Sequence, residues 1–413
     1  MNNFPGFELP LPGDGPAPAA YPPAGGLYVP PSPHIASVTG TQPKETGEVT
    51  PAVERLFDLI DKCGVDGVSD VHIHPGKEIR KLRRGTLRRE PGPAGTYSFE
   101  EITEWLNYGK PGVVDPLGVK GHASVAIDSG TYRIRCTFRR STAGITVTFR
   151  VIPSVVPNAD AIGVPKIIQD LTTRDSGLIV VEGPTGSGKT TLIASMINKI
   201  NYETDKHIYM VEDPIEFIHQ EQGHTSIVQR EIGVHALDYA TAIEDALRSK
   251  PNVIVIGELL DPATTRAALH AATTGHLVIT TAHAGSVTEA LDSFVGKFTA
   301  DEQPQIRSRF SQSLLAVLVQ KLVPTVDGRL TAAREVMIND LNFTELIRDE
   351  KSHMIRSQIS GSKGGFTLEE SLADLCIKGA ITPETAMYSA KDAISMTHLL
   401  QRAEIAIPEE GQL

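Results

Sequence analysis

The sequence lacks the features of disulfide-stapled, zinc-binding and membrane-spanning proteins. Its 413 residues include three cysteines, Cys63, Cys136 and Cys376, and no two of them form a CxxC pair. This scarcity argues against a disulfide framework or a cysteine-rich zinc site and fits a reducing compartment. Apolar runs such as residues 314–319 are far shorter than the roughly 20 residues that a membrane helix needs. The first residues are uncharged and soon interrupted by prolines, so we expect no secretory signal and a soluble, cytoplasmic protein.

Positive charge and aromatic side chains are also scarce. The chain has 39 lysines and arginines against 50 aspartates and glutamates, a formal net charge of −11, and aromatic residues make up 5% of it. Proteins that coat nucleic acid present a broad basic surface, and those that hold single strands intersperse aromatic with basic side chains. The composition therefore argues against direct nucleic-acid binding, although it leaves room for a local basic patch.

Composition and periodicity divide the chain into five segments. Residues 1–48 are rich in proline and glycine, which predicts a disordered tail or, alternatively, a proline-rich docking segment. Residues 49–153 begin with a helical pattern and continue as alternating strands, which predicts an α+β domain. A proline-containing linker follows over 154–165. An α/β domain is expected over 166–395, and a flexible tail over 396–413.

The α/β domain is predicted from continuous apolar strands that alternate with helices. The segments GLIVVEG, HIYMVED, NVIVIGE and HLVITTAH each contain such a strand. Strands of this kind joined by helical crossovers form a parallel sheet covered by helices on both faces. The spacing over residues 301–400, including SRFSQSLLAVLVQKLV, predicts a mostly helical C-terminal portion.

A phosphate-binding loop is the strongest local signal. The stretch GPTGSGKTT matches G-x-x-x-x-G-K-[ST] between a predicted strand and a predicted helix, a context that argues against the alternative of an ordinary glycine-rich turn. Backbone N–H groups of such a loop surround phosphate oxygens, its lysine contacts the β- and γ-phosphates, and its threonine offers a hydroxyl to Mg²⁺. We therefore expect ATP to be bound by Gly183, Pro184, Thr185, Gly186, Ser187, Gly188, Lys189, Thr190 and Thr191, with Thr190 also binding Mg²⁺.

Acidic residues end two of the predicted strands. Glu258 follows Gly257 after the strand VIVI, and its long side chain can reach the attacking water, or a Mg²⁺-bound water, as a general base or water-orienting group. Alternatively, Glu258 stabilises the N-terminus of the next helix. Glu212 ends HIYMVE and is a second catalytic candidate, although the following Asp213-Pro214 pair also suits a simple turn. We expect the loop and Glu258 to face each other across one cleft.

Two histidines flank the strand LVITT. His276 precedes it and His283 follows it. An imidazole near the γ-phosphate can sense the state of the nucleotide. Each histidine is therefore a candidate nucleotide sensor, and the alternative for each is a structural role.

Four of these segments, in this order, resemble the Walker A, Asp box, Walker B and His box of the type II and type IV secretion ATPases. They are GPTGSGKTT, MVEDPIEF, the segment ending in NVIVIGE, and TTGHLVITTAH. The likeness covers roughly residues 50–395 and is greatest to PilT-like pilus retraction motors. It implies a PAS-like N-terminal domain, a RecA-like P-loop ATPase core, a homohexameric ring, ATP and Mg²⁺ as ligands, and a secretion, conjugation or pilus platform at the inner membrane as partner. The protein would then associate with the membrane peripherally, through its partners.

The resemblance also implies that arginines of the N-terminal domain contact the phosphates. A guanidinium can neutralise charge that develops on the γ-phosphate. The alternative for any one of these arginines is a solvated basic face. The candidates are Arg133, Arg135, Arg140 and Arg150.

The chain departs from the retraction motors in three respects. Leu260 stands where the family usually has arginine, Asn252 where it often has aspartate, and the proline-rich segment is additional. These differences favour a branch similar to the DotB and plasmid TraJ transfer ATPases. Three functions are compatible with these residues: a hexameric transport motor, a RecA-type nucleic-acid motor, and a ring scaffold that uses ATP only for assembly.

A basic stretch, EIRKLRRGTLRRE, has a glycine midway and predicts a hairpin. Its charges are either simply solvated or dock on anionic lipid or an acidic partner.

Overall fold

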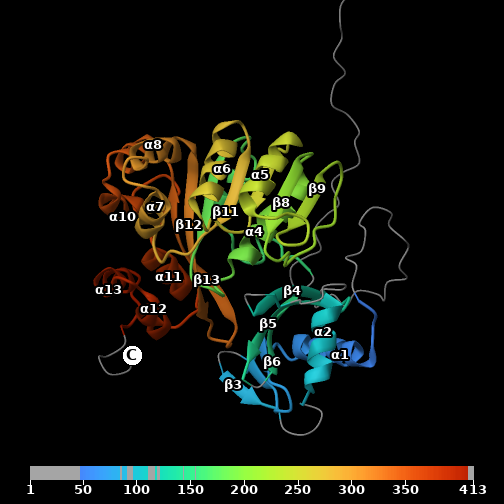
Figure 1. The fold of residues 1–413 in the computed structure, drawn as a ribbon. Helices are drawn as coiled ribbons and strands as arrows, with labels where there is room; N and C mark the ends of the chain where they lie inside the picture. The colour runs from blue at the N-terminus through green and yellow to red at the C-terminus, as the bar shows by residue number, and fades with distance from the viewer. Residues whose placement is uncertain are drawn as a thin grey trace, which may run out of the picture. The chain divides into compact units, whose positions relative to one another are not determined.

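The computed structural model describes most of the chain beyond the proline-rich segment. Two β-sheets, each with its own helices, follow one another along this part (Figure 1). The predicted tail lies outside the described residues as far as residue 46, and so do Arg84 and Gly85 of the basic stretch. The described residues are 47–83, 86–90, 96–109, 117–118, 121–142, 144–153 and 155–407.

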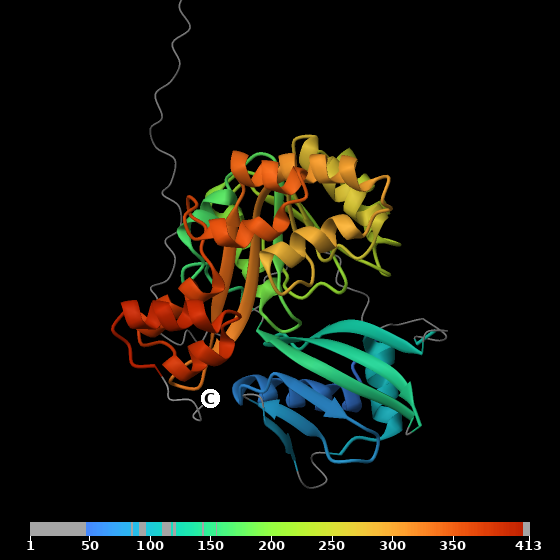
Figure 2. The same ribbon diagram turned by 90° about the vertical axis from the view of Figure 1, so that its left-hand side faces the viewer.

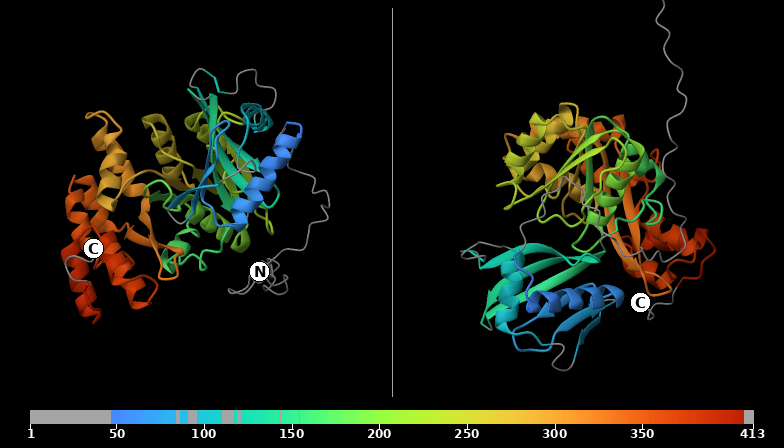
Figure 3. Two further views of the ribbon diagram at one scale, coloured as in Figure 1. Left: turned by 90° about the horizontal axis from the view of Figure 1, so that it is seen from below. Right: turned by 90° about the vertical axis from the view of Figure 1, so that its right-hand side faces the viewer.

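The first sheet is antiparallel and has six strands in the order β3-β2-β1-β6-β5-β4. The helices α1 (Pro51–Val65) and α2 (Phe99–Gly109) pack on one of its faces, as Figure 2 and the right-hand view of Figure 3 show. The strands are β1 (Asp70–Ile73), β2 (Arg80–Arg83), β3 (Thr86–Arg89), β4 (His122–Asp128), β5 (Tyr132–Ser141) and β6 (Gly144–Pro153).

Local sequence explains how this first unit is held together. The Thr50 side chain caps α1, and Pro51 occupies the first turn, where its missing N–H has no consequence. Trp105 of α2 is fully buried, and its indole N–H donates a hydrogen bond of 2.7 Å to the carbonyl of Ala52. The two helices are therefore joined by a satisfied polar contact within an apolar core.

The predicted basic hairpin is confirmed by the pairing of β2 with β3. Arg80 lies opposite Arg89, and Lys81 lies opposite Arg88. Like charges that face each other directly across two strands destabilise the pair. An ion pair between Lys81 and Glu90 offsets part of this repulsion.

The second sheet has seven strands in the order β13-β12-β7-β11-β10-β8-β9. Its neighbouring strands are parallel except for the edge strand β13, which runs antiparallel to β12. The predicted parallel sheet is thus confirmed, with one antiparallel edge added. The strands are β7 (Gly177–Glu182), β8 (His207–Glu212), β9 (Ser226–Glu231), β10 (Val253–Ile256), β11 (Leu277–Thr281), β12 (Leu314–Pro324) and β13 (Leu330–Ile338).

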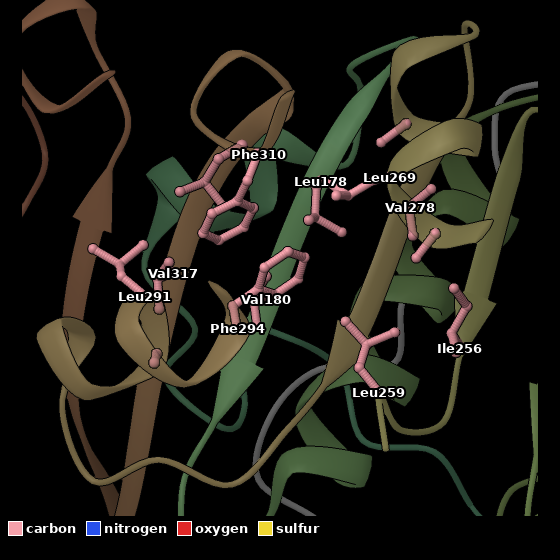
Figure 4. Close-up of a cluster of buried hydrophobic side chains, with 14 of the residues drawn as sticks. Leu178, Val180, Ile256, Leu259, Leu269, Val278, Leu291, Phe294, Phe310 and Val317 are labelled. Atoms are coloured by element: carbon pink, nitrogen blue, oxygen red, sulfur yellow. The ribbon is translucent and has the colours of Figure 1, made fainter. Parts of the chain in front are cut away.

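Helices cover both faces of this sheet, because its central strands are apolar on both sides. Leu178 and Val180 of β7 face α6, α7 and α8, where the rings of Phe294 and Phe310 stack at 3.9 Å (Figure 4). Ile179, between them in sequence, packs on the other face against α3 and α4. The helices of the core are α3 (Lys166–Leu171), α4 (Lys189–Glu203), α5 (Tyr239–Arg248), α6 (Pro262–Thr273), α7 (Val287–Gly296) and α8 (Gln303–Ser313).

The C-terminal portion differs from the expectation in two places. The segment LLAVLVQKLV, predicted as helix, forms β12, because it inserts beside β7, where strand residues are buried on both faces. The flexible tail predicted from residue 396 is wrong for its first residues, since Met396 and Leu400 lie fully buried in α13. The helices of this portion are α9 (Leu341–Arg348), the 3₁₀ turn η2 (Ser352–Met354), α10 (Ile355–Ile359), α11 (Leu368–Ile377), α12 (Pro383–Ser389) and α13 (Ala393–Arg402).

None of the helices in the described ranges combines the length and apolarity that crossing a bilayer requires.

Candidate functional site

The glycine-rich loop joins the carboxyl end of β7 to the start of α4. Gly183 has a φ of 139°, and a Cβ there would lie 2.3 Å from the carbonyl oxygen of Gln320, so no larger residue fits. Gly188 precedes α4 with a φ of 83°, and no described side chain caps the first turn of this helix. The N–H groups of that turn are therefore available to an anion, as phosphate binding requires.

Lys189, His283 and Glu258 form a continuous row beside this loop. The Lys189 ammonium donates to the carbonyls of Gly183 at 2.6 Å and Pro184 at 3.3 Å, and it lies 3.3 Å from Nδ1 of His283. Nε2 of His283 lies 3.0 Å from Oε1 of Glu258. Because an ammonium can only donate, Nδ1 accepts, and the imidazole proton sits on Nε2, facing the carboxylate.

Gly257 allows Glu258 to stand at the end of β10. A Cβ on Gly257 would lie 2.8 Å from the Tyr239 hydroxyl and 3.2 Å from the carbonyl oxygen of Val211. The carbonyl of Gly257 accepts a hydrogen bond of 2.6 Å from the Thr281 hydroxyl on β11. The glycine therefore lets neighbouring elements close tightly around the backbone that presents the acid.

A residue other than Glu258 stabilises the N-terminus of the helix that follows β10. Asp261 is the N-cap of α6, and its carboxylate accepts from the backbone N–H of Thr264 at 2.8 Å. Glu258 lies before this cap, and its carboxylate reaches His283 instead. The carboxylate of Glu258 therefore does not cap α6 and lies on the side of the sheet that carries the phosphate-binding loop.

Two buried glutamates end the strands β8 and β7. Burial raises the pKa of Glu212 to about 7, against a weaker opposing effect of the Gln229 amide, which donates to Glu212 at 3.2 Å. Burial likewise raises the pKa of Glu182 to about 7, although the nearby ammonium groups of Lys297 and Lys189 favour its ionised form. Glu182 is not among the residues predicted from the sequence, although an acid that ends a buried strand directly before the loop is a recognisable signal.

The loop and Glu258 line the same cleft, whose volume is about 520 Å³. Clefts of several hundred Å³ hold small ligands and cofactors. Its lining includes Asp70, Arg135, Arg150, residues 185–191, Glu212, Glu216, Tyr239, Glu258 and His283.

The four candidate arginines occupy different positions. Arg135 and Arg150 line the cleft, where Arg135 pairs with Glu216 at 3.1 Å and Arg150 pairs with Asp70 at 3.0 Å. Arg133 is buried and donates to the backbone carbonyl of Ile215 at 3.1 Å, so it serves a structural contact. Arg140 is exposed near the turn between β5 and β6 and does not line the cleft.

The position of His276 corrects the expectation that both histidines can sense the nucleotide. It precedes β11, whereas His283 follows it, and a strand of five residues separates its ends by about 16 Å. His276 Nδ1 lies 3.1 Å from the carbonyl oxygen of Ala271 and is absent from the cleft lining. The loop is at the carboxyl ends of the strands, so His276 lies at the wrong edge of the sheet to contact phosphate.

The residues of the cleft can supply the few protein ligands that a nucleotide-bound metal ion needs. No group of three or more histidine, cysteine or acidic residues poised to hold a metal occurs among the residues that the structure describes. Mg²⁺ bound with a nucleotide needs few protein ligands, because phosphates and waters complete its octahedron. One hydroxyl, from Thr190, and one carboxylate, from Glu258, both in the cleft lining, satisfy this requirement.

Comparisons with known proteins show the family of the chain. The family model described as type II/IV secretion system protein matches residues 119–401. The chain is 38% identical over 356 residues to the type IV pilus retraction ATPase PilT of Pseudomonas aeruginosa, covering 81% of this chain and 98% of that protein.

Two solved structures show the same fold. A crystal structure of the pilus retraction motor PilT with bound ADP matches with a TM-score of 0.73 and 29% identity, over 83% of this chain and 99% of that one. The Legionella pneumophila ATPase DotB matches with a TM-score of 0.67 and 26% identity, over 81% and 94%. The chain therefore belongs to the type II/IV secretion system protein family and is an ATPase of its PilT-like, DotB-related group.

Proposed function

We propose that the protein is a motor subunit that hydrolyses Mg²⁺-ATP in this cleft and powers a type IV-related secretion, conjugative transfer or pilus system. The observation that carries the proposal is the row Lys189–His283–Glu258 beside the loop, in one cleft. A cation for the phosphates and a carboxylate for the attacking water are both required for in-line hydrolysis.

Each residue of the row has a distinct role in this proposal. Lys189 and the N–H groups of residues 183–191 bind the phosphates, so Lys189 exchanges its loop carbonyls for phosphate oxygens. Glu258 orients and deprotonates the water, while the Nε2 proton of His283 fixes one carboxylate oxygen and leaves the other to the water. His283 is at the same time the nucleotide sensor, because it touches both Lys189 and Glu258.

Further groups complete the proposed site. Thr190 would hold Mg²⁺ through its hydroxyl and Glu258 through a bound water, and the metal would supply positive charge beside the phosphates. Glu212, buried at the end of β8, is a second acid for the water network. Arg135 and Arg150 approach the phosphates from the first sheet, exchanging Glu216 and Asp70 for the nucleotide.

The relatives support a proposal for the assembly and location of the protein. We propose a homohexameric ring, with residues 49–153 as a PAS-like domain, residues 154–165 as linker and residues 166–395 as the RecA-like motor. The ring would lie in the cytoplasm, held peripherally at the inner membrane by the proteins of its secretion or pilus platform. The similarity to PilT and DotB supports this placement.

Replacing Glu258 by glutamine tests the catalytic proposal. The amide keeps the shape of the side chain but cannot accept a proton, so ATP turnover should fall by about 10²–10⁴-fold, the usual contribution of general base catalysis. Affinity for ATP should stay near that of the natural protein. Phosphate release and calorimetric ATP binding measure the two quantities separately.

Glu244→Gln is the matched control for this experiment. Glu244 is an exposed acid on α5, outside the cleft lining, so this variant should hydrolyse ATP at the natural rate. Normal turnover by Glu258→Gln would refute the catalytic role of Glu258. Absence of ATP binding by the natural protein would refute the proposed function itself.

A further inference from the structure

Arg334 of β13 is a buried guanidinium whose partners are neutral. It is 4% exposed, and among the described residues no carboxylate pairs with it. Its Nε donates to Oε1 of Gln320 at 2.8 Å, and its two terminal nitrogens donate to the carbonyls of Gly163 at 2.6 Å and Ile162 at 3.1 Å. Burial lowers the pKa of Arg334 to about 10, so the charge is held at a cost in free energy.

Gln320 carries this contact onward to the phosphate-binding loop. Its amide nitrogen donates to the carbonyl of Ser187 at 2.7 Å, across 133 residues of sequence. A Cβ on Gly183 would collide with the backbone oxygen of Gln320. A Cβ on Gly188 would lie 3.0 Å from the amide nitrogen of the Gln320 side chain. Gln320 therefore touches the loop near both of its ends.

The other end of the contact is the linker between the two sheets. Ile162 and Gly163 lie in the stretch between β6 and α3, and Gly163 adopts a left-handed φ of 63°. A planar guanidinium holds both linker carbonyls and Gln320 with three nitrogens in a fixed fork, whereas the three donors of an ammonium all lie on one nitrogen and do not reproduce this geometry. A continuous chain of hydrogen bonds therefore runs from the linker through Arg334 and Gln320 to Ser187.

We propose that Arg334 is a positioning residue that couples the linker to the phosphate-binding loop through Gln320. When nucleotide fixes the loop, the linker carbonyls are fixed with it, and a displacement of the linker loosens the loop. The proposal rests on nucleotide binding at the loop, and it adds a route by which movement of the first sheet reaches the phosphates.

A double-mutant cycle in ADP affinity tests the coupling. Gln320→Met keeps the side-chain length and Arg334→Met keeps the apolar stem, but both remove the hydrogen bonds. Each should raise the Kd for ADP about five- to tenfold, the effect of losing a buried hydrogen bond that orders the loop. Because both residues act in the same chain of hydrogen bonds, the double variant should bind ADP no more weakly than either single variant. Multiplied effects in the double variant would overturn the proposal.

Amide exchange of the linker gives a readout that a merely structural role would not change. In the natural protein, ADP should slow hydrogen exchange of the peptide over residues 155–165, where the N–H of Val164 is bonded to Ala159. In Gln320→Met at saturating ADP, this slowing should disappear. Persistence of the slowing would overturn the coupling even if affinity fell.

Two further variants keep the test decisive. Arg329→Met removes an exposed arginine from the β12–β13 turn, where it pairs with Asp327, and should leave ADP affinity unchanged. If Arg334→Met does not fold, Arg334→Lys replaces it, because lysine retains the charge but not the fork, and weaker ADP binding is still expected. Natural affinity in a folded Arg334 variant refutes the coupling, whereas failure of the natural protein to bind ADP refutes the proposed function instead.

Discussion

Glu182 and Glu212 end buried strands with their carboxyls withdrawn from bulk water. Both have a pKa raised to about 7 by burial. A carboxyl whose folded pKa exceeds its unfolded value binds its proton more tightly when the protein is folded. The contribution of these residues to the free energy of unfolding is therefore greatest below about pH 4.5 and falls as the pH rises towards 7.

Replacing Glu182 by glutamine should remove its share of this dependence. An amide cannot ionise, so the variant should be more stable than the natural protein by roughly 1–3 kcal/mol at about pH 8 and little different at about pH 5. Urea unfolding at the two pH values measures the difference. Equal effects at both pH values would show that Glu182 is not the group that titrates, and Glu244→Gln is the exposed control.

At the scale of single elements, the short strand β10 shows how packing fixes the position of Glu258, the proposed catalytic carboxylate. Its four residues are all buried, and it ends where Gly257 meets Tyr239 and Val211. A residue with a side chain at this point must push β8 or α5 away. The position of Glu258 thus depends on the absence of a side chain next to it.

Gly257→Ala is therefore expected to harm both stability and activity. The added methyl should lower the free energy of unfolding by about 1–3 kcal/mol, the usual penalty of overpacking, and should reduce turnover by displacing Glu258. Gly296→Ala is the matched control, because a Cβ there meets nothing within 4 Å at the end of α7. Unchanged unfolding and turnover in Gly257→Ala would contradict the packing argument.

The sequence predicted those elements whose signal is local. The strands β7, β8, β10 and β11 were predicted because a continuous apolar run bounded by turn residues indicates a buried strand. The strand β12 was not, because its apolar run follows directly on α8 and its length suits either structure. Only the pairing of β12 with β7, far away in sequence, decides between helix and strand.

The same distinction holds for the site. Lys189, Glu258 and His283 lie in or beside recognisable motifs, and the structure brings them together. His276 could have been excluded from the sequence, since the amino end of a parallel strand lies opposite the edge that carries the loop. Arg334 and Gln320 face each other across the β12–β13 hairpin, but their contacts with the linker and the loop were beyond prediction, because those segments are 133 to 172 residues away in sequence.

At the scale of the whole molecule, polar contacts join the first sheet to the segment between β8 and β9. Arg135 of β5 pairs with Glu216 of that segment, and Arg133 donates to the carbonyl of Ile215. Exposed ion pairs of this kind contribute little free energy. They suit the movement between the two sheets that the proposed motor function requires.

The proposed ring makes a prediction at this scale. Light scattering should give a mass six times the chain mass of 44.5 kDa when the Glu258→Gln variant is loaded with ATP. Repeated copies of one interface close into a ring when the rotation between neighbours permits it, and bound ATP favours the closed form by mass action. A single-chain mass with ATP bound, at concentrations up to tens of micromolar, would contradict the ring.

The position of β12 next to β7 has a consequence for biosynthesis. β7 ends at Glu182, but the neighbour that braces its loop begins only at Leu314. During translation the nascent loop has therefore left the ribosome long before Gln320 exists to support it. We therefore expect the loop to gain its support from Gln320 only after β12 has been synthesised and has paired with β7.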